Sequence, residues 1–159
     1  MKATYARRPV LRAKWYFDCS CARCVDPTEC GSFLSALLCP SPSPSKPCSG
    51  LVLSCNPLSG SSDWSCQACS ALYSAEYVIA LVTEAAAMID KPREEDDIVQ
   101  HYERTIHHFS TTLHPSHYLI IGIKEKLAQI YGNFIPYKLL DLPRPLKERK
   151  IQVRSTNST

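Results

Sequence analysis

The sequence has no run of apolar residues approaching the roughly 18 that a membrane-spanning helix needs. Its first eight residues are charged, but no apolar run follows them, so we expect no secretory signal. It also lacks a Gly-rich phosphate loop, an H-E-x-x-H pattern and the residue order of a Ser/His/Asp triad. We therefore expect no membrane partner and assign no catalytic residue, and we place the protein inside the cell, in the nucleus, the cytoplasm or both.

The positive charge of the chain is also small. The formal net charge is +3 and the isoelectric point is near 8.4, which is too weak to indicate nucleic-acid binding by itself. Residues 1–16 are basic and contain no acid, so a phosphate-binding arm there is one alternative. The simpler interpretation is a short helix leading into the cysteines. Because no dense basic face is present, we expect no nucleic-acid partner.

The informative part of the sequence holds all nine cysteines, between Cys19 and Cys69. The first cluster is a C-x-C-x-x-C pattern, formed by Cys19, Cys21 and Cys24. The second cluster consists of Cys39, Cys48, Cys66 and Cys69. Thiolates a few positions apart can turn toward one tetrahedral ion, and two pairs separated by a longer loop are typical of a zinc ribbon. The Pro/Ser loop 40–47 stretches the first pair, but lengthening a loop costs little closure entropy.

Disulfide bonds are the alternative to zinc. The odd number of cysteines and the expected lack of a secretory signal favour metal ligands over disulfides. Cys30 and Cys55 lie outside both clusters, and we expect each to be a small buried hydrophobic residue. It stays open whether one of them completes the first cluster as a fourth ligand.

The rest of the sequence indicates two halves of different character, an irregular N-terminal half and a helical C-terminal half. Before residue 65 the apolar pattern is too irregular for a large core, so metal binding would supply the missing folding energy. The aromatic run Trp15–Phe17 predicts either a packing anchor or a platform on which a flat ligand stacks. The run Leu51–Leu53 predicts a short strand.

From residue 70 onward, three apolar stripes have helical spacing. They begin near Tyr77, Ile98 and Ile120, and the second runs to Leu113. The His114-Pro115 turn predicts an antiparallel hairpin of the last two helices, with Pro115 in the first turn of the last one.

We therefore predict a mainly α fold with a small, irregular, zinc-stabilised N-terminal part and a helical hairpin resembling a tetratricopeptide unit. The predicted domains are residues 1–24 with the first cysteine motif, a zinc-binding knot at 25–70, a helical region at 71–135 and a tail at 136–159. The five histidines have no cysteine or carboxylate partner at ligand spacing, so we interpret them as surface or packing residues.

Several motifs together resemble the SET-and-MYND (SMYD) proteins, and within them the arthropod-type, msta-like branch. The resemblance covers residues 5 to about 150. It rests on Arg7-Arg8, Tyr16–Cys24, Asp26–Glu29, Ser35–Leu37, Cys39, Cys48, Asn56–Leu58, Trp64, Cys66–Cys69, Leu113–Tyr118 and Leu127–Gly132.

The resemblance implies a protein-lysine methyltransferase that uses S-adenosylmethionine and is linked to transcription regulation. Residues 1–24 would then be the end of the SET region with its post-SET motif. Its three cysteines would bind one zinc together with a fourth ligand from the SET core, and the second cluster would bind another zinc. Phe17 matches the aromatic residue that stacks on the cofactor's adenine. The region from residue 70 would begin a tetratricopeptide-like C-terminal part.

The MYND finger and the SET core of that family have no counterpart here, so the chain looks like a C-terminal fragment. One hypothesis is the end of a SMYD-type methyltransferase that is inactive alone, with S-adenosylmethionine and a histone or other lysine substrate bound only by the full-length form. The other is a non-catalytic zinc-and-helix module that binds a protein or peptide partner. A nucleic-acid-binding zinc ribbon is a third, weaker alternative.

Overall fold

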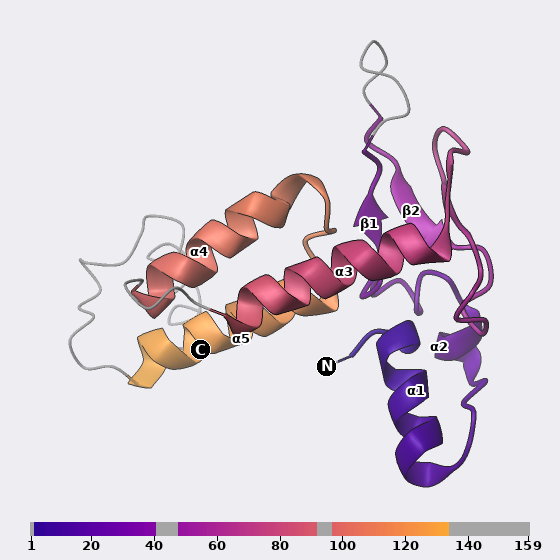
Figure 1. The fold of residues 1–159 in the computed structure, drawn as a ribbon, viewed down its shortest axis with the longest axis horizontal. Coiled ribbons are helices and arrows are strands. Elements are labelled where there is room, and N and C mark those ends of the chain that lie inside the picture. Colours follow the sequence, from indigo (N-terminus) through magenta and orange to yellow (C-terminus); the bar gives the residue numbers. More distant parts are fainter. Residues whose placement is uncertain (1, 41–47, 92–96, 134–159) are drawn as a thin grey trace, which may run out of the picture. The chain divides into compact units, whose positions relative to one another are not determined.

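The computed structural model describes residues 2–40, 48–91 and 97–133. The loop predicted at 40–47, apart from Pro40, lies outside the described residues, as do the acidic residues 94–96 and the predicted tail. Figure 1 shows the fold, whose elements in chain order are α1 (Thr4–Trp15), α2 (Ala22–Val25), β1 (Leu37–Leu38), β2 (Leu51–Ser54), β3 (Trp64–Cys66), β4 (Leu72–Tyr73), α3 (Ala75–Asp90), α4 (Ile98–His108), the 3-10 turn η1 (Phe109–Thr111) and α5 (Tyr118–Asn133).

Backbone contacts divide the chain after Glu125. The first unit, Met1–Glu125, contains both cysteine clusters, the sheet and most of the helices. The second unit, Lys126–Thr159, is described only through the last turns of α5. Everything that follows on packing and sites concerns residues of the first unit.

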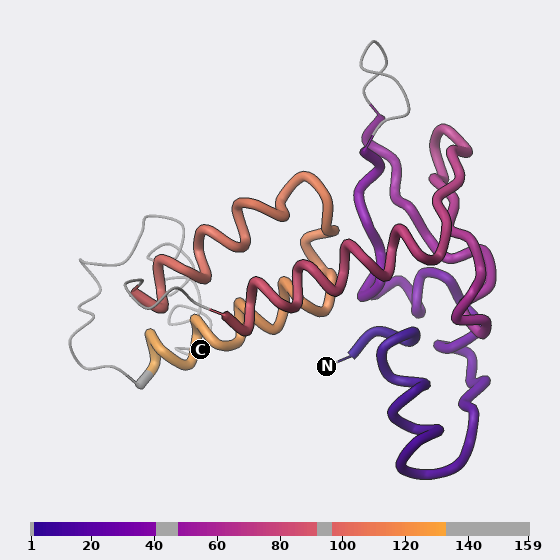
Figure 2. Tube along the Cα trace, viewed as in Figure 1, coloured from indigo at the N-terminus to yellow at the C-terminus, as the bar shows by residue number. Residues whose placement is uncertain are grey.

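The basic lead of the chain forms α1, as expected. Arg12 lies in its last turn, where the helix dipole favours a cation. The helix ends at Tyr16, which adopts a left-handed conformation with φ of 55° and donates its N–H to the Arg12 carbonyl. The trace then runs back along the helix toward α2 (Figure 2), where the Arg8 side chain donates to the Cys19 carbonyl at 3.0 Å.

A buried carboxylate ties α1 to the loop that follows α2. Glu29 is 1% exposed and has a left-handed backbone with φ of 54°. Its carboxylate accepts the Thr4 N–H at the start of α1 (3.0 Å) and the Ser35 hydroxyl, and it pairs with Arg23 at 3.0 Å. Since each of these partners belongs to a different segment, Glu29 joins three parts of the chain that are separate in sequence.

The strands form one antiparallel sheet in the order β1-β2-β3-β4. Its central register pairs Leu37 with Val52 and Val52 with Cys66. The predicted strand at Leu51–Leu53 is confirmed as part of β2. The other three strands were missed because two or three residues are too short to show an alternating pattern. The N-terminal half is therefore more regular than predicted.

The three predicted helices exist, and side chains cap two of them. The Ser74 hydroxyl accepts the Tyr77 N–H at the start of α3, and the Asp97 carboxylate accepts the Val99 N–H at the start of α4. The helix-rich character of the fold class is thereby confirmed. Contacts join α4 to α3, and Figure 1 shows α4 running back beside it. The tetratricopeptide-like hairpin and the domain boundaries stay predictions.

Three details of the helix prediction were wrong. The buried face of α3 consists of Val78, Val82, Ala85 and Ile89, whereas Tyr77, placed in the predicted stripe, is 44% exposed. The second helix was expected to continue to Leu113, but it ends at His108 and tightens into η1. Pro115 does not open the last helix, because it lies in a turn before Tyr118.

One apolar core joins the sheet to the helices. It consists of Leu37, Cys39, Val52, Trp64, Cys66, Val78, Val82, Ala85, Phe109, Leu113 and Ile120. Two of its members are cysteines of the second cluster, so the core and that cluster share side chains. Among the helices of the described ranges, none has the length and apolar character that crossing a membrane requires.

The predictions for two cysteine side chains were wrong, and one alternative for the aromatic run is removed. Cys30 and Cys55 are exposed and do not act as small buried residues. Cys30 has a left-handed backbone, with φ of 59°, in the turn that follows α2. Cys55 directly follows β2. Both side chains therefore lie away from the core. Trp15 is 68% exposed, which removes the packing-anchor alternative for that ring, while the stacking alternative stays a prediction.

The core also contains a neutral histidine that makes stability sensitive to acid. His117 is fully buried, its Nδ1 accepts the Leu119 N–H, and its Nε2 lies 3.5 Å from the Tyr5 hydroxyl. Burial, followed by the nearby His114, lowers the pKa of His117 to about 3. At a pH below the ordinary pKa of histidine, the unfolded chain binds a proton at His117 that the folded chain does not bind. The free energy of unfolding therefore decreases as the pH falls.

We expect the free energy of unfolding to fall by about 1 kcal/mol between pH 7 and pH 5.5 through His117 alone. Denaturant unfolding at both pH values should show a smaller decrease for His117→Gln than for the wild type. The exposed His107 provides the control, because His107→Gln should keep the wild-type decrease. Equal decreases in the wild type and His117→Gln would contradict this assignment.

Candidate metal centres

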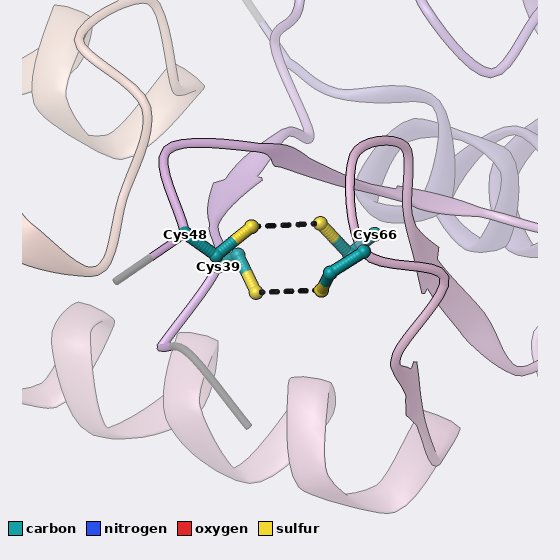
Figure 3. A group of neighbouring side chains, drawn as sticks. Cys39, Cys48 and Cys66 are labelled. Carbon is teal, nitrogen blue, oxygen red and sulfur yellow. Dashed lines mark hydrogen bonds between the residues drawn. The ribbon is translucent and has the colours of Figure 1, made fainter. Parts of the chain in front are cut away.

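The second cluster brings four thiols together from residues up to 30 positions apart. The Sγ atoms of Cys39, Cys48, Cys66 and Cys69 all lie within 4.8 Å of one another. Figure 3 shows the sulfurs of Cys39 and Cys48 pointing toward the segment that carries Cys66. The Cys48–Cys66 and Cys39–Cys69 sulfur distances are 3.6 and 3.7 Å. None of the nine cysteines forms a disulfide bond.

The sheet produces this convergence. Cys39 directly follows β1 and Cys48 lies shortly before β2, while Cys66 ends β3 and Cys69 lies in the turn before β4. Ladder bonds continue into both turns, with the Cys39 N–H donating to the Gly50 carbonyl at 3.0 Å. Two neighbouring hairpin ends therefore each present one pair of thiols to the same point.

The sulfur spacing fits zinc and excludes a disulfide in this conformation. Four sulfurs about 2.3 Å from one ion lie about 3.8 Å apart at the corners of a tetrahedron. The observed 3.6 and 3.7 Å agree with that spacing, whereas a disulfide requires about 2.05 Å. Cys39 and Cys66 are buried, Cys48 is half-buried and Cys69 is exposed, so the cluster lies at the edge of the core.

Hydrogen bonds to the sulfurs prepare the cluster for a cation. The backbone N–H groups of Gly50 and Ala68 each lie 3.4 Å from a sulfur, those of Cys48 and Cys66 respectively. The Tyr73 hydroxyl lies 3.2 Å from the Cys39 sulfur. Such bonds stabilise thiolates and orient them, as outer-shell partners do around metal ligands.

The four thiols do not ionise together without a counter-charge. Although burial opposes it, the N–H groups of Cys69 and Ala68 lower the pKa of Cys66 to about 7. For Cys69 the Ala71 N–H acts in the same direction, but desolvation and the neighbouring thiols raise its pKa to about 12. A divalent cation would remove this conflict, since it stabilises all four thiolates at once.

A glycine leaves the space that the cluster needs. A Cβ atom at Gly50 would lie 2.5 Å from the Cys66 sulfur and 2.6 Å from the Ala68 Cβ. Both distances are shorter than non-bonded atoms allow. Gly50 is therefore required by close approach of the two hairpin ends, and no left-handed backbone is involved.

The first cluster is a set of three thiols beside an arginine. The sulfurs of Cys19, Cys21 and Cys24 lie within 4.8 Å of one another, with Cys24 buried and Cys21 exposed. The Arg7 guanidinium donates to the Cys24 sulfur at 2.7 Å. The Cys24 N–H, followed by the neighbouring thiols and Arg7, lowers the pKa of Cys21 to about 6. Burial, followed by the neighbouring thiols, raises the pKa of Cys24, and the charge of Arg7 acts against that increase.

No fourth ligand joins the first cluster among the described residues. Neither Cys30 nor Cys55 belongs to this group of sulfurs, and a fourth ligand from either of them stays a prediction. Phe17 lies two positions before Cys19 and is 48% exposed, which leaves part of its ring accessible. Its predicted role in stacking on a cofactor stays a prediction.

The sequence pattern identified the cysteines and missed the residues that support them. Gly50 and Tyr73 contact the second cluster, and Arg7 contacts the first. The spacing of Gly50, two positions after Cys48, was the available signal, because a backbone N–H at that position commonly faces the sulfur. Nothing near Tyr73 or Arg7 in the sequence marks a sulfur partner, since both contacts cross between elements.

Comparison with known proteins supports a SMYD-like relationship. The chain is 38% identical over 71 residues to the SET domain-containing protein SmydA-8, isoform B, of Drosophila melanogaster. The matched stretch covers 45% of this chain and 15% of that protein's length. No family model and no solved structure matches the chain.

We expect Gly50→Ala to weaken zinc binding at the second cluster by at least tenfold, because the added methyl group forces the two hairpin ends apart. Competition with a chromophoric zinc chelator measures this affinity. Gly60→Ala is the matched control, since a Cβ there meets nothing within 4 Å. Equal affinities for the two variants would show that the close approach at Gly50 is not needed for metal binding.

Proposed function

We propose that this chain is a zinc-binding C-terminal region of a SET-and-MYND-type protein and that it carries no SET catalytic core. The observation that supports it best is the four-sulfur cluster, whose spacing suits a tetrahedral zinc ion. The partial match to SmydA-8 supports the family assignment. The matched stretch covers only 15% of that relative's length. Any activity of a full-length protein is therefore also a proposal.

The proposed role of the second cluster is structural. When bound, zinc would neutralise the thiolates and link Cys39 and Cys48 to Cys66 and Cys69, with no position left for a substrate. Its binding free energy would add to folding, because the sulfurs come together only in the folded sheet. This contribution matters here since the sheet consists of very short strands.

The proposed role of the first cluster is that of a half-site. Cys19, Cys21 and Cys24 would bind a second zinc only when a SET core supplies the fourth ligand. Phe17, half-exposed beside these cysteines, would then stack on the adenine of S-adenosylmethionine. In a full-length protein this arrangement would serve methyl transfer to a lysine of a histone or another protein, with a role in transcription regulation.

A second candidate function is a non-catalytic interaction module. The exposed apolar side chains of Leu72 and Tyr77 favour it, since they lie on β4 and in the first turn of α3. A protein or peptide partner could cover such residues. In this case the zinc cluster would serve only to hold the sheet beneath them.

We expect one zinc ion per chain in purified, reduced protein, bound at the second cluster. Elemental analysis should find it lost in Cys66→Ser and retained in Cys21→Ser, since among the described residues the second cluster has four ligand atoms together and the first has three. Two zinc ions would mean that the first cluster finds a fourth ligand within this chain. A zinc-free wild type would remove the basis of the proposal.

We also expect this chain alone to transfer no methyl group from S-adenosylmethionine to histones or lysine peptides. Radiolabelled cofactor with the zinc-loaded chain measures this directly. A SmydA-8-type protein that includes its SET domain provides the parallel reaction. Transfer by the isolated chain that disappears on chelation of zinc would contradict the proposed absence of a catalytic core.

A further inference from the structure

A pocket of about 330 Å³ lies between α1 and the loop that joins β2 to β3. Its lining combines two arginines of α1, Arg8 and Arg12, with apolar side chains that include Pro9, Pro57 and Leu58. None of the nine cysteines, all of which lie in the described ranges, lines this pocket. It is therefore a site apart from the sulfur atoms of both clusters.

The charges that line the pocket do not cancel. Arg8 and Arg12 lie one helical turn apart, and Asp18, in the segment after α1, is the only acid among the described residues of the lining. An Asp18 oxygen lies 3.8 Å from an Arg8 nitrogen, and the other lies 3.7 Å from an Arg12 nitrogen. Charge-assisted hydrogen bonds are about 2.7–2.9 Å long, so Asp18 is hydrogen-bonded to neither arginine. One positive charge is left uncompensated.

The two arginines differ in how much of their hydrogen-bonding capacity the chain uses. The Nε of Arg8 donates to the Cys19 carbonyl at 3.0 Å, and its Nη1 donates to the Leu58 carbonyl. The Arg12 side chain is 76% exposed, and within the described part of the chain its guanidinium has only the loose ion pair with Asp18. Arg8 therefore supplies a fixed charge, whereas the planar guanidinium of Arg12 is accessible and has donors left for a ligand.

These features favour a monoanion with an apolar part. A cation would be repelled by the two guanidinium groups, and a dianion would carry more charge than the lining leaves uncompensated. A carboxylate has one charge and two coplanar oxygens, which match the parallel N–H groups of an arginine. The proline and leucine side chains offer apolar surface to the rest of the molecule. We propose that this pocket binds a carboxylate that carries an apolar group, with the carboxylate paired to Arg12 and the apolar group against the proline rings.

N-acetyl-leucine, its amide and acetate are suitable probes, because the amide lacks the charge and acetate lacks the apolar group. Each is titrated into the zinc-loaded full chain, and NMR chemical shifts of the Arg12 side-chain N–H and of the Tyr5 ring, which also lines the pocket, give the affinities. N-acetyl-leucine should bind about tenfold more tightly than either of the others, since each lacks one of the two interactions. Equal affinities for N-acetyl-leucine and its amide, or no saturable shift with any probe, would overturn the proposal.

A fourth probe distinguishes two sources of such a carboxylate. An acetylated tripeptide that ends in leucine has the same terminal group as N-acetyl-leucine and a longer chain. Tighter binding of the tripeptide would assign the pocket to the C-terminal carboxylate of a protein, and equal binding would assign it to a small organic acid. Both results support a carboxylate site, whereas failure of the tripeptide and of N-acetyl-leucine would exclude it.

Two substitutions should change the affinity in opposite directions. Arg12→Gln removes the guanidinium donors and should weaken N-acetyl-leucine binding about tenfold. Asp18→Asn keeps the shape of the side chain and removes the competing carboxylate, so it should strengthen binding about fivefold. Both side chains are at least half-exposed or nearly so and neither is hydrogen-bonded within the described ranges, so the fold should tolerate both changes. Weaker binding by Asp18→Asn would contradict the assigned electrostatics and overturn the proposal.

Lys14→Gln is the matched control for Arg12→Gln. Lys14 is an exposed cation in the same last turn of α1, and it does not line the pocket. The two substitutions change the net charge equally, so only Arg12→Gln should weaken binding. Equal weakening by both would reduce the effect to the net charge of the protein and would exclude the assigned contact. None of these substitutions replaces a metal ligand, so the result is independent of the proposed zinc function.

Discussion

The convergence of four cysteine sulfurs is the constraint on which the rest of this fold depends. The cysteines belong to two hairpin ends, and they can meet only if β1–β2 and β3–β4 lie in one sheet with one register. Strands of two to four residues bury little apolar surface and form few ladder bonds. The interaction between the thiols and a cation would therefore supply free energy that the strands alone do not.

The same constraint connects the sheet to the helices. Cys39 and Cys66 are both thiols of the cluster and buried members of the apolar core that includes Val78, Val82 and Leu113. A change in the position of the cluster would shift the surface on which α3 packs. Zinc binding and helix packing should thus be coupled, and loss of one should weaken the other.

A second hydrogen-bond network joins α1 to the segment between α2 and β1. Glu29 is buried in a left-handed backbone conformation and is bonded to Thr4, Arg23 and Ser35. Arg23 is partly exposed while Glu29 is buried, so loss of Arg23 would leave the buried carboxylate with only neutral donors, the Thr4 N–H and the Ser35 hydroxyl. The left-handed backbone of Glu29 is thus held in place by three bonds to its carboxylate.

The sequence by itself determined the features that depend on local pattern: the helical stripes after residue 70, the strand at Leu51–Leu53 and the pairing of Cys39 and Cys48 with Cys66 and Cys69. Only the tertiary structure decided which side chains are buried. Cys30 and Cys55 are exposed, although cysteine is among the residue types most often buried. It also decided the contacts of Gly50, Tyr73 and Arg7 with the sulfurs. These contacts join segments that are distant in the chain, and no periodicity or spacing within a single segment records them.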